Sequence, residues 1–338
     1  PPVERAESVG IIGAGPGGLA AAEALRIKGY QVTVYERYDR VGGLLIYGIP
    51  NFKLEKEVVQ RRAERLIEGG VTFVLNCEIG RDVSFEELRA RHAAVLIATG
   101  VYKAREAALP NSGAKGVFAA MEYLTASNRA GLGDDVSALT HLNAKGKKVV
   151  VIGGGDTAMD CVRTAVRQGA KSVTCLYRRD RANMPGSQRE VANAEEEGVV
   201  FEWLAAPKAI LGAARKATGV KAARMRLGRA DASGRQAPEE IPDSQFDVPA
   251  DIVINALGFD PEDLPELWGA PELKVTRWGT LRTDAKLQTN LSGVFAVGDI
   301  VRGASLVVWA IRDGRDAADS VQAYLKARAA DNARIAAE

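Results

Sequence analysis

Two glycine-rich segments of this 338-residue chain each lie between an apolar run and a helix-forming run. The first is Gly13-Ala14-Gly15-Pro16-Gly17-Gly18, and the second is Gly153-Gly154-Gly155-Asp156-Thr157-Ala158. Glycines at these spacings allow a tight turn, a close approach of the backbone to a pyrophosphate, and close packing of a helix on a strand. The free N–H groups at the start of the following helix then face the phosphates. The two segments therefore predict two dinucleotide sites.

The strand expected after each glycine segment ends in an opposite charge. Residues 31–35 lead into Glu36, whereas residues 172–177 lead into Arg178-Arg179. A carboxylate at this position accepts hydrogen bonds from the ribose hydroxyls and repels a 2′-phosphate, and a guanidinium pair attracts that phosphate. The sequence thus predicts one dinucleotide with a free ribose, NADPH as the other, and hydride transfer between them.

Both features also have a plainer interpretation. A glycine segment can simply make a tight turn, and a pair of arginines can be solvated surface charge. A lone glycine motif is weak on its own, but here each one follows a strand, opens a helix and is followed by a strand with a charged end. This context favours the nucleotide interpretation.

A third candidate site follows the apolar residues 293–297, where Gly298-Asp299 precedes Gly303-Ala304-Ser305. An aspartate at a strand end can hold a polyol hydroxyl, and a helix opening at Ser305 can place positive potential beside the pyrimidine edge of a flavin. Taken alone, Asp299 is better interpreted as an ordinary N-terminal turn residue. The histidines, His92 and His141, are interpreted as surface or linker residues. No catalytic residue is assigned, because hydride transfer aligns two rings and needs no acid–base group.

The pattern of apolar runs and glycines predicts an α/β fold with two Rossmann-like nucleotide-binding domains, the second nested in the first. This arrangement resembles that of flavoproteins of the glutathione and thioredoxin reductase type, in which the outer domain binds FAD. The outer domain is expected at residues 1–128 and 280–338, and the nested NADPH-binding domain at 146–279. Residues 129–145, which are polar and have no strong period, are expected to form a linker.

The composition excludes several classes of protein. A net charge of +2 gives no basic field for nucleic acid, and runs such as 93–98 and 149–152 are too short to cross a membrane. The three cysteines form no C-x-x-C pair and are expected to be buried thiols in a reducing compartment, which predicts a cytoplasmic protein. The chain begins with Pro1 rather than Met, so it is expected to be processed or excised from a longer protein.

The chain closely resembles the small (β) subunits of bacterial NADPH-dependent glutamate synthases over nearly its whole length. The most specific segment is 177–187, which begins Tyr177-Arg178-Arg179-Asp180 and ends Asn183-Met184-Pro185-Gly186-Ser187. The other matching segments are residues 41–54, 98–100, 153–160 and 298–308. Related cores look similar in dihydropyrimidine dehydrogenase and in the flavoprotein subunit of NADPH–ferredoxin transhydrogenases.

The resemblance implies FAD in the outer domain and NADPH in the nested one. It implies that Gly13 to Gly18 hold the FAD pyrophosphate and Glu36 its ribose, and that Gly43-Leu44 and Lys53 hold further parts of FAD. It implies that Asp299 and residues 305–308 hold the ribityl chain and the flavin ring. It also implies that residues 155–158, Arg178 and Arg179 hold NADPH, with residues 256–258 close to its nicotinamide half. No metal-ligating residue is predicted. The predicted cofactor-binding residues are Gly13, Gly15, Pro16, Gly17, Gly18, Glu36, Arg37, Gly43, Leu44, Lys53, Thr99, Gly100, Gly153, Gly155, Asp156, Thr157, Ala158, Arg178, Arg179, Ala256, Leu257, Gly258, Gly298, Asp299, Ser305, Leu306, Val307 and Val308.

The chain departs from the family in one respect. Family members carry a cysteine-rich segment ahead of the first glycine loop that binds two four-iron, four-sulfur clusters, but none of the residues before Gly10 is a cysteine. The chain is therefore expected to be a fragment, or to receive the clusters from a partner. The implied partner is the glutamate synthase large (α) subunit, which makes glutamate from glutamine and 2-oxoglutarate. The alternatives are a stand-alone NADPH–ferredoxin or acceptor reductase and a non-catalytic flavoprotein scaffold.

Overall fold

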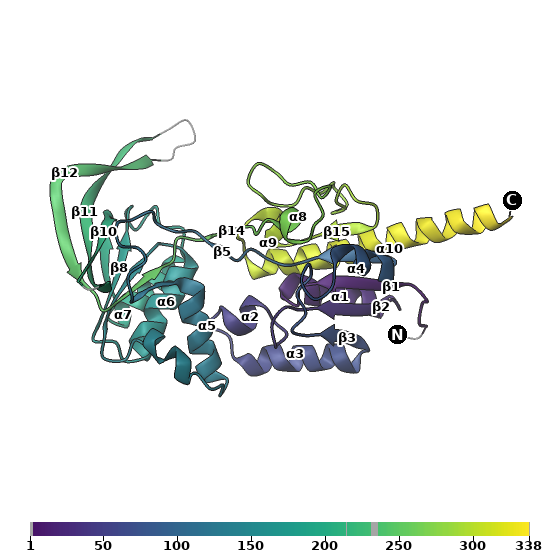
Figure 1. The fold of residues 1–338 in the computed structure, drawn as a ribbon, viewed down its shortest axis with the longest axis horizontal. Coiled ribbons are helices and arrows are strands. Elements are labelled where there is room, and N and C mark those ends of the chain that lie inside the picture. The colour runs from purple at the N-terminus through teal and green to yellow at the C-terminus, as the bar shows by residue number, and fades with distance from the viewer. Residues whose placement is uncertain (1–2, 214, 231–235, 338) are drawn as a thin grey trace. The chain divides into compact units, whose positions relative to one another are not determined.

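The computed structural model describes residues 3–213, 215–230 and 236–337 and divides into two compact units. The first unit comprises Pro1–Ile46, Leu54–Lys103 and Phe259–Glu338, and the second comprises Tyr47–Lys53 and Ala104–Gly258. Each unit is built around a parallel sheet flanked by helices (Figure 1). The predicted fold class is therefore confirmed.

The first unit contains a five-stranded parallel sheet in the order β15–β4–β1–β2–β3. Its strands are β1 (Ser8–Ile12), β2 (Gln31–Tyr35), β3 (Val71–Val74), β4 (Ala94–Ile97) and β15 (Val294–Ala296). Its helices are α1 (Pro16–Ile27), α3 (Lys56–Glu68), α4 (Phe85–Arg91), α8 (Leu264–Leu267), α9 (Asp299–Arg302) and α10 (Val307–Ala337), and α2 (Leu44–Tyr47) leads into the second unit. Strand β4 is buried at every residue, as expected for a strand of a sheet that is covered on both faces.

The second unit contains a five-stranded parallel sheet in the order β6–β13–β7–β8–β9. Its strands are β6 (Val117–Ala119), β7 (Lys148–Ile152), β8 (Ser172–Tyr177), β9 (Val200–Trp203) and β13 (Ile252–Asn255). Its helices are α5 (Ala120–Gly131), α6 (Asp156–Arg167), α7 (Gln188–Glu196) and the short 3-10 helix Ser137–Leu142. The strands β10 (Ala205–Ala213), β11 (Lys216–Ala230) and β12 (Gln236–Pro249) form an antiparallel sheet, and β5 (Lys103–Ala104) and β14 (Phe259–Asp260) lie where the chain passes between the units.

Each unit contains the same strand–helix–strand arrangement, formed by β1–α1–β2 in the first and by β7–α6–β8 in the second. In the first unit Ile12 pairs with Tyr35, and in the second Ile152 pairs with Leu176. Both glycine segments therefore leave the sheet at the carboxyl ends of parallel strands. This is the edge at which open α/β sheets bind ligands.

The boundaries of the two units differ from the predicted domains. Residues 104–145 belong to the second unit and residues 259–279 to the first, whereas we expected a linker at 129–145 and a second domain that continues to 279. The difference arises because β6 pairs with β13, with Val117 opposite Val253, and so extends the second sheet. A strand of three residues carries too little periodic pattern to be assigned to a sheet from sequence.

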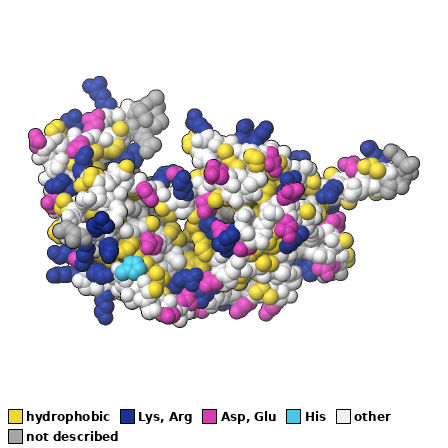
Figure 2. Space-filling model, viewed as in Figure 1, with side chains coloured by type: hydrophobic (Ala, Val, Ile, Leu, Met, Phe, Trp, Pro, Cys, Tyr) yellow, Lys and Arg dark blue, Asp and Glu magenta, His cyan; other side chains and the backbone are white. Residues whose placement is uncertain are grey.

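The exposed surface of the chain is of mixed charge. Basic and acidic side chains are interspersed over the face seen in Figure 2, in keeping with the net charge of +2. Among the described residues, no helix is long and apolar enough to cross a membrane.

Helices α1 and α10 pack with their backbones very close together. A Cβ atom added at Gly314 would lie 2.2 Å from the carbonyl oxygen of Gly17, and one added at Gly17 would lie 3.2 Å from the carbonyl oxygen of Ala310. Farther along α10, the small residues Ala317 and Ala318 are both fully buried. Glycine at position 314 is therefore required for this contact, although glycine is a poor helix former.

We expect Gly314→Ala to destabilise the first unit by about 1–3 kcal/mol, because the added methyl group meets backbone that cannot move aside cheaply. Gly131→Ala in α5 is the matched control, since a Cβ there would meet nothing within 4 Å. Guanidinium denaturation followed by circular dichroism measures both effects. Unchanged stability in the Gly314 variant would show that the two helices repack freely.

Candidate functional site

The first glycine segment makes the tight turn between β1 and α1. Gly13 has a φ of 103°, and a Cβ atom there would lie 2.4 Å from the carbonyl oxygen of Ala98. A Cβ at Gly18 would lie 2.0 Å from the carbonyl oxygen of Gly13, so α1 can start this close to the turn only with glycine. At Gly15, the N-cap of α1, a Cβ would meet nothing within 4 Å. Open space therefore faces the first N–H groups of the helix, as an anion site requires.

Glu36, which follows β2, is buried against the same turn. Its side chain is 5% exposed, and its Oε2 accepts a hydrogen bond from the Ala14 N–H at 2.8 Å. Its Oε1 accepts a second hydrogen bond from the Tyr38 N–H at 3.0 Å. Burial raises the pKa of the Glu36 carboxyl, and these N–H donors oppose the rise. The carboxylate thus holds the turn in shape, a role that the sequence pattern did not reveal.

A cavity of about 320 Å³ opens beside this turn within the first unit. Two of the residues predicted to bind a cofactor here, Gly18 and Val308, do not line the cavity. Val308 is 64% exposed. The hydroxyl oxygen of Thr99 is buried and has no hydrogen-bond partner among the described residues, so a polar group is available for a ligand. The predicted residues that line the cavity are Gly13, Gly15, Pro16, Gly17, Glu36, Arg37, Gly43, Leu44, Thr99, Gly100, Gly298, Asp299, Ser305, Leu306 and Val307.

Much of the cavity wall consists of residues that the sequence analysis did not identify. Arg37 lies 4.7 Å from the ring centroid of Tyr102 and 5.2 Å from that of Tyr38, and it pairs with Glu262 at 3.0 Å. Burial raises the pKa of the Tyr102 hydroxyl. Tyr102 and Glu262 come from chain segments far from Arg37, so no local pattern signals their contact with it. The missed lining residues are Ile12, Tyr35, Tyr38, Cys77, Glu78, Ile79, Gly80, Arg81, Ala98, Tyr102, Glu262, Leu264, Leu267, Trp268, Val297 and Ala310.

Asp299 reaches the cavity from the end of β15 and begins α9. Gly298 precedes it with a φ of 72°. Burial raises the pKa of the Asp299 carboxyl to about 6, the Ser305 N–H opposes this rise, and the nearby Asp313 carboxylate adds to it. Helix α10 begins at Val307 and is 31 residues long, so its N-terminus directs positive potential toward this end of the cavity.

The second glycine segment repeats the geometry of the first between β7 and α6. Gly153 has a φ of 149°, and a Cβ atom there would lie 2.2 Å from the carbonyl oxygen of Ala256. Gly155 is the N-cap of α6, and a Cβ there would meet nothing within 4 Å. Because Ala256 follows β13, which pairs with β7, the predicted residues Ala256, Leu257 and Gly258 lie at the same sheet edge as the turn.

The chain after β8 folds back onto the second turn. The Gly186 N–H donates to the Gly154 carbonyl oxygen at 2.9 Å, and the Ser187 N–H donates to Asp156 Oδ1 at 2.9 Å. Asp156 therefore fixes this segment to the start of α6. Thr157 and Ala158 follow in the first turn of the helix, and Ala158 is fully buried.

Arg178 and Arg179 begin this folded-back segment. Because Leu176 pairs with Ile152, both arginines follow β8 at the level of the glycine turn. Arg178 is exposed and Arg179 is half-buried. The Arg179 Nε is enclosed and has no hydrogen-bond partner within the described part of the chain. The arrangement can present one guanidinium group to solvent and a second beside it to an anionic ligand.

Lys53 is placed differently from the other predicted FAD residues. It belongs to the second unit, where its Nζ lies 2.8 Å from Asp160 Oδ1 and 3.1 Å from Glu190 Oε2. It does not line the cavity of the first unit. The expectation that Lys53 contacts FAD rested on the family resemblance, and the ion-pair partners of Lys53 are too distant along the chain to be inferred from sequence.

His92 is a structural residue rather than the surface residue that we expected. Its ring nitrogens lie 3.0 Å from Ser8 Oγ and 2.9 Å from the Tyr35 hydroxyl oxygen. His141 is exposed, and all three cysteines are buried free thiols. Within residues 3–213, 215–230 and 236–337, no group of three or more His, Cys, Asp or Glu side chains could hold a metal ion.

Comparison with known proteins gives a consistent family assignment. Residues 7–314 match the pyridine nucleotide-disulphide oxidoreductase family. The chain is 64% identical to the glutamate synthase [NADPH] small chain of Azospirillum brasilense, over all of this chain and 70% of that one. It is 66% identical to a provisionally named glutamate synthase [NADPH] small chain of Cereibacter sphaeroides, over all of this chain and 81% of that one.

Solved structures share the fold at lower sequence identity. The structure of Mycobacterium tuberculosis FprA in complex with NADPH superimposes with a TM-score of 0.80 at 21% identity, covering 97% of this chain and 86% of that one. Thioredoxin reductase from T. acidophilum superimposes with a TM-score of 0.69 at 20% identity, covering 95% of this chain and 98% of that one.

We expect the substitution Asp299→Asn to flatten the pH dependence of stability in nucleotide-free protein. The pKa of Asp299 is raised to about 6 in the folded state, so the folded protein binds the proton more tightly than the unfolded chain. This contribution is complete below the unfolded pKa of about 4 and is lost as the pH rises through 6. The unfolding temperature of Asp299→Asn should therefore rise relative to wild type between pH 4 and pH 7, measured by scanning fluorimetry.

Asp331→Asn, at an exposed aspartate of α10, is the control for this measurement. A difference between Asp299→Asn and wild type that stays constant over this pH range would contradict the prediction.

Proposed function

Since this chain belongs to the pyridine nucleotide-disulphide oxidoreductase family and, within it, to the glutamate synthase [NADPH] small chains, we propose that it is the FAD-containing subunit that oxidises NADPH and supplies electrons to a glutamate synthase large subunit. The observation that carries the proposal is the opposite charge at two equivalent strand ends. One is the buried carboxylate of Glu36, and the other is the pair Arg178 and Arg179.

The cavity of the first unit is the proposed FAD site. When bound, FAD supplies a ring that accepts a hydride and passes electrons on. The N–H groups at the start of α1 would face its pyrophosphate across the open side of Gly15. Each carboxylate oxygen of Glu36 can accept further hydrogen bonds beyond those from Ala14 and Tyr38, so ribose hydroxyls can be accommodated. The unpartnered hydroxyl of Thr99 adds a polar contact on the cavity wall.

Asp299 and the start of α10 are the proposed flavin end of this site. The Asp299 carboxylate would accept a hydrogen bond from a polyol hydroxyl, and such a donor would lower its raised pKa. The α10 N-terminus would stabilise negative charge at the pyrimidine edge. Leu306 and Val307 line the cavity there and would exclude water from the ring.

The second glycine turn is the proposed NADPH site. The start of α6 would face the pyrophosphate across the open side of Gly155, and Arg178 with Arg179 would bind the 2′-phosphate. The nicotinamide half would extend toward residues 256–258. Asn255, which ends β13, has a buried side-chain oxygen without a hydrogen-bond partner among the described residues, and it offers an acceptor at that edge.

The electrons are proposed to leave through iron–sulfur clusters on another segment or protein. From there they would reach the large (α) subunit, which makes L-glutamate from glutamine and 2-oxoglutarate. The three buried free thiols are compatible with a reducing compartment such as the cytoplasm, where we place this reaction.

We expect NADPH to bleach the flavin absorbance of the purified chain under anaerobic conditions, because the chain holds both dinucleotide sites. Anaerobic titration with NADPH and a redox dye as final acceptor measures this. A chain that retains FAD but is never bleached would be a scaffold and would contradict the proposal. Rapid reduction of added ferredoxin would instead support the stand-alone reductase.

We expect Arg178→Ala combined with Arg179→Ala to raise the KM for NADPH by roughly 30- to 1000-fold and to leave that for NADH within about twofold. The reason is that charge-assisted contacts to the 2′-phosphate are worth on the order of 2–4 kcal/mol together, and NADH lacks that group. Steady-state kinetics with both nucleotides measure the change.

Arg181→Ala is the matched control for this pair. Arg181 lies in the same segment, is exposed, and pairs with Glu195 at 2.9 Å. Equal loss of NADPH and NADH activity in the double variant would refute the assignment of the arginine pair to the 2′-phosphate.

A further inference from the structure

The chain between β8 and α7 forms a loop that lies entirely within the second unit. We call residues 178–187 the arginine loop, because it begins with the arginine pair. It ends at Ser187, the N-cap of α7. The loop contains the segment that matches the glutamate synthase small chains most specifically, yet the proposed NADPH site uses only its first two residues.

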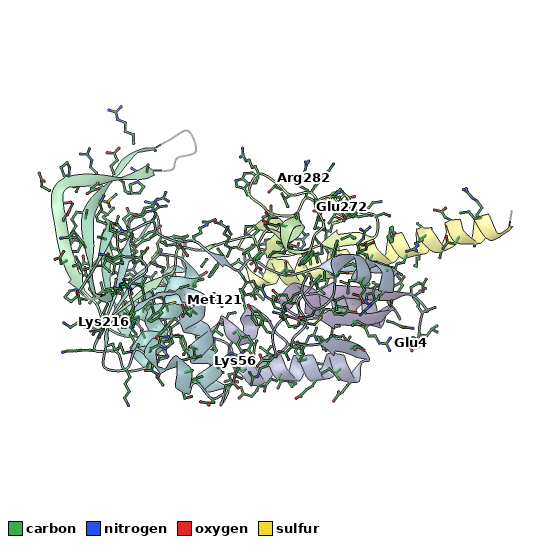
Figure 3. The ribbon with its side chains drawn as sticks, in the orientation of Figure 1. Glu4, Lys56, Met121, Lys216, Glu272 and Arg282 are labelled. Atoms are coloured by element: carbon green, nitrogen blue, oxygen red, sulfur yellow. The ribbon has the colours of Figure 1, made fainter. Side chains whose placement is uncertain are left out.

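The first end of the arginine loop is held by strands of two sheets. Tyr177, the last residue of β8, pairs with the end of β9. The Arg179 carbonyl oxygen accepts a hydrogen bond from the Leu204 N–H at 3.0 Å. The Leu204 carbonyl oxygen in turn accepts one from the Met225 N–H at 2.7 Å, and Met225 lies on β11, whose first residue, Lys216, is labelled in Figure 3. The backbone of the arginine pair is therefore tied to both sheets of the second unit.

The second end of the arginine loop is held by the second glycine turn. The hydrogen bonds from the Gly186 N–H to Gly154 and from the Ser187 N–H to Asp156 are both 2.9 Å long. A Cβ atom added at Gly186 would lie 3.0 Å from the Gly154 carbonyl oxygen, so the two backbones are in close contact. The arginine loop thus connects the arginine pair to the turn that opens α6.

The middle of the arginine loop is held at a single residue, Asn183. The Tyr177 hydroxyl donates to the Asn183 carbonyl oxygen at 3.1 Å. Asp180 Oδ1 accepts from the Asn183 N–H at 2.9 Å and from Asn183 Nδ2 at 2.7 Å. Asn183 is itself exposed, whereas the next residue, Met184, is 6% exposed and belongs to the core of the second unit. Tyr177 and Asp180 therefore determine how the loop folds between its two ends.

The Tyr177 ring links this loop to the glycine turn. A Cβ atom added at Gly154 would lie 2.3 Å from Cε2 of the ring, so the ring packs directly on the turn. The side chain is 9% exposed, and its edge faces the Trp203 ring at a centroid distance of 6.4 Å. Tyr177 thus contacts the glycine turn with its ring and the arginine loop with its hydroxyl.

The sheet alone does not extend this connection to the arginine pair. The ladder between β7 and β8 ends with Ile152 and Leu176, before the pair begins. Arg178 is exposed, and the Arg179 Nε has no hydrogen-bond partner among the described residues. The arginine loop is therefore a second connection between the glycine turn and the backbone that carries the two guanidinium groups.

We propose that Tyr177 and Asp180 are positioning residues for the selection of NADPH: by holding Asn183 they fix the arginine loop and thereby the spacing between the arginine pair and the glycine turn. The inference rests on the function proposed above. NADPH carries a pyrophosphate and a 2′-phosphate in one molecule, so it binds best when both positions are correctly spaced before it arrives. NADH lacks the 2′-phosphate and does not depend on this spacing.

Tyr177→Phe combined with Asp180→Ala tests this inference, because it removes the three hydrogen bonds of Asn183 and keeps the tyrosine ring and both arginines. With the full chain loaded with FAD, we expect the Kd for NADP⁺ to rise by roughly 5- to 30-fold, as the loss of a few exposed hydrogen bonds does. The Kd values for NAD⁺ and for 2′-AMP, each of which occupies one phosphate position, should stay within about threefold. Isothermal titration calorimetry measures all three.

Two further variants separate positioning from charge and from a general effect on folding. Tyr177→Phe alone removes one hydroxyl and should show the same pattern with a smaller rise, roughly 2- to 5-fold for NADP⁺. Asp180→Asn keeps the acceptor oxygen and removes the charge, so its Kd for NADP⁺ should stay within about twofold of wild type. A loss in Asp180→Asn as large as that in the combined variant would assign the effect to charge and would overturn the positioning role.

Tyr123→Phe and Asp251→Ala are the matched controls in the same unit. The Tyr123 hydroxyl donates to Gln168 Oε1 at 2.9 Å, and Asp251 Oδ2 accepts from the Lys148 N–H at 2.9 Å. Each control removes a hydrogen bond of the same kind outside the arginine loop. Both should leave the preference for NADP⁺ over NAD⁺ unchanged.

The outcomes distinguish the two proposals. A wild-type chain that binds NADP⁺ no more tightly than NAD⁺ would overturn the proposed NADPH site and this inference with it. A wild-type preference for NADP⁺ that persists in the combined variant would overturn the positioning role alone. Equal weakening of NADP⁺ and 2′-AMP would show that the two residues act on the arginine pair rather than on the spacing, and it would also overturn the inference.

Discussion

The structure depends on a close backbone approach that leaves no room for a side chain at the first glycine of each glycine turn. Gly13 lies against the carbonyl of Ala98, and Gly153 lies against the carbonyl of Ala256, each with a positive φ. In the first unit Gly18 adds a second contact of this kind, against Gly13 itself. These contacts bring a helix N-terminus to the carboxyl edge of a parallel sheet, with its first N–H groups toward open space. Any larger residue would move the helix away and remove the anion site.

The charged residues that follow the two glycine turns, Glu36 and Arg178, differ in how firmly their side chains are held. Both oxygens of Glu36 accept backbone hydrogen bonds, so the carboxylate is held in place, and a phosphate at the proposed ribose position would meet it. Arg178 is exposed, so its side chain could adjust to the proposed 2′-phosphate. Exclusion of the wrong nucleotide needs a rigid group, because a mobile one would simply move aside. Attraction of the right one tolerates a flexible side chain.

Much of the fold and part of the candidate site could be predicted from sequence because they are encoded locally. The glycine turns and Glu36 each lie within a few residues of the strand that positions them, so spacing identifies them, whereas the pattern around Asp299 taken alone indicated only a turn residue. The cavity wall could not be predicted in this way. Tyr102, Glu262 and Trp268 follow different elements and meet only in the folded unit. Strand β6 was missed because three residues of pairing carry almost no pattern. The ion pairs of Lys53 with Asp160 and Glu190 could not be predicted, because these partners are far from it along the chain.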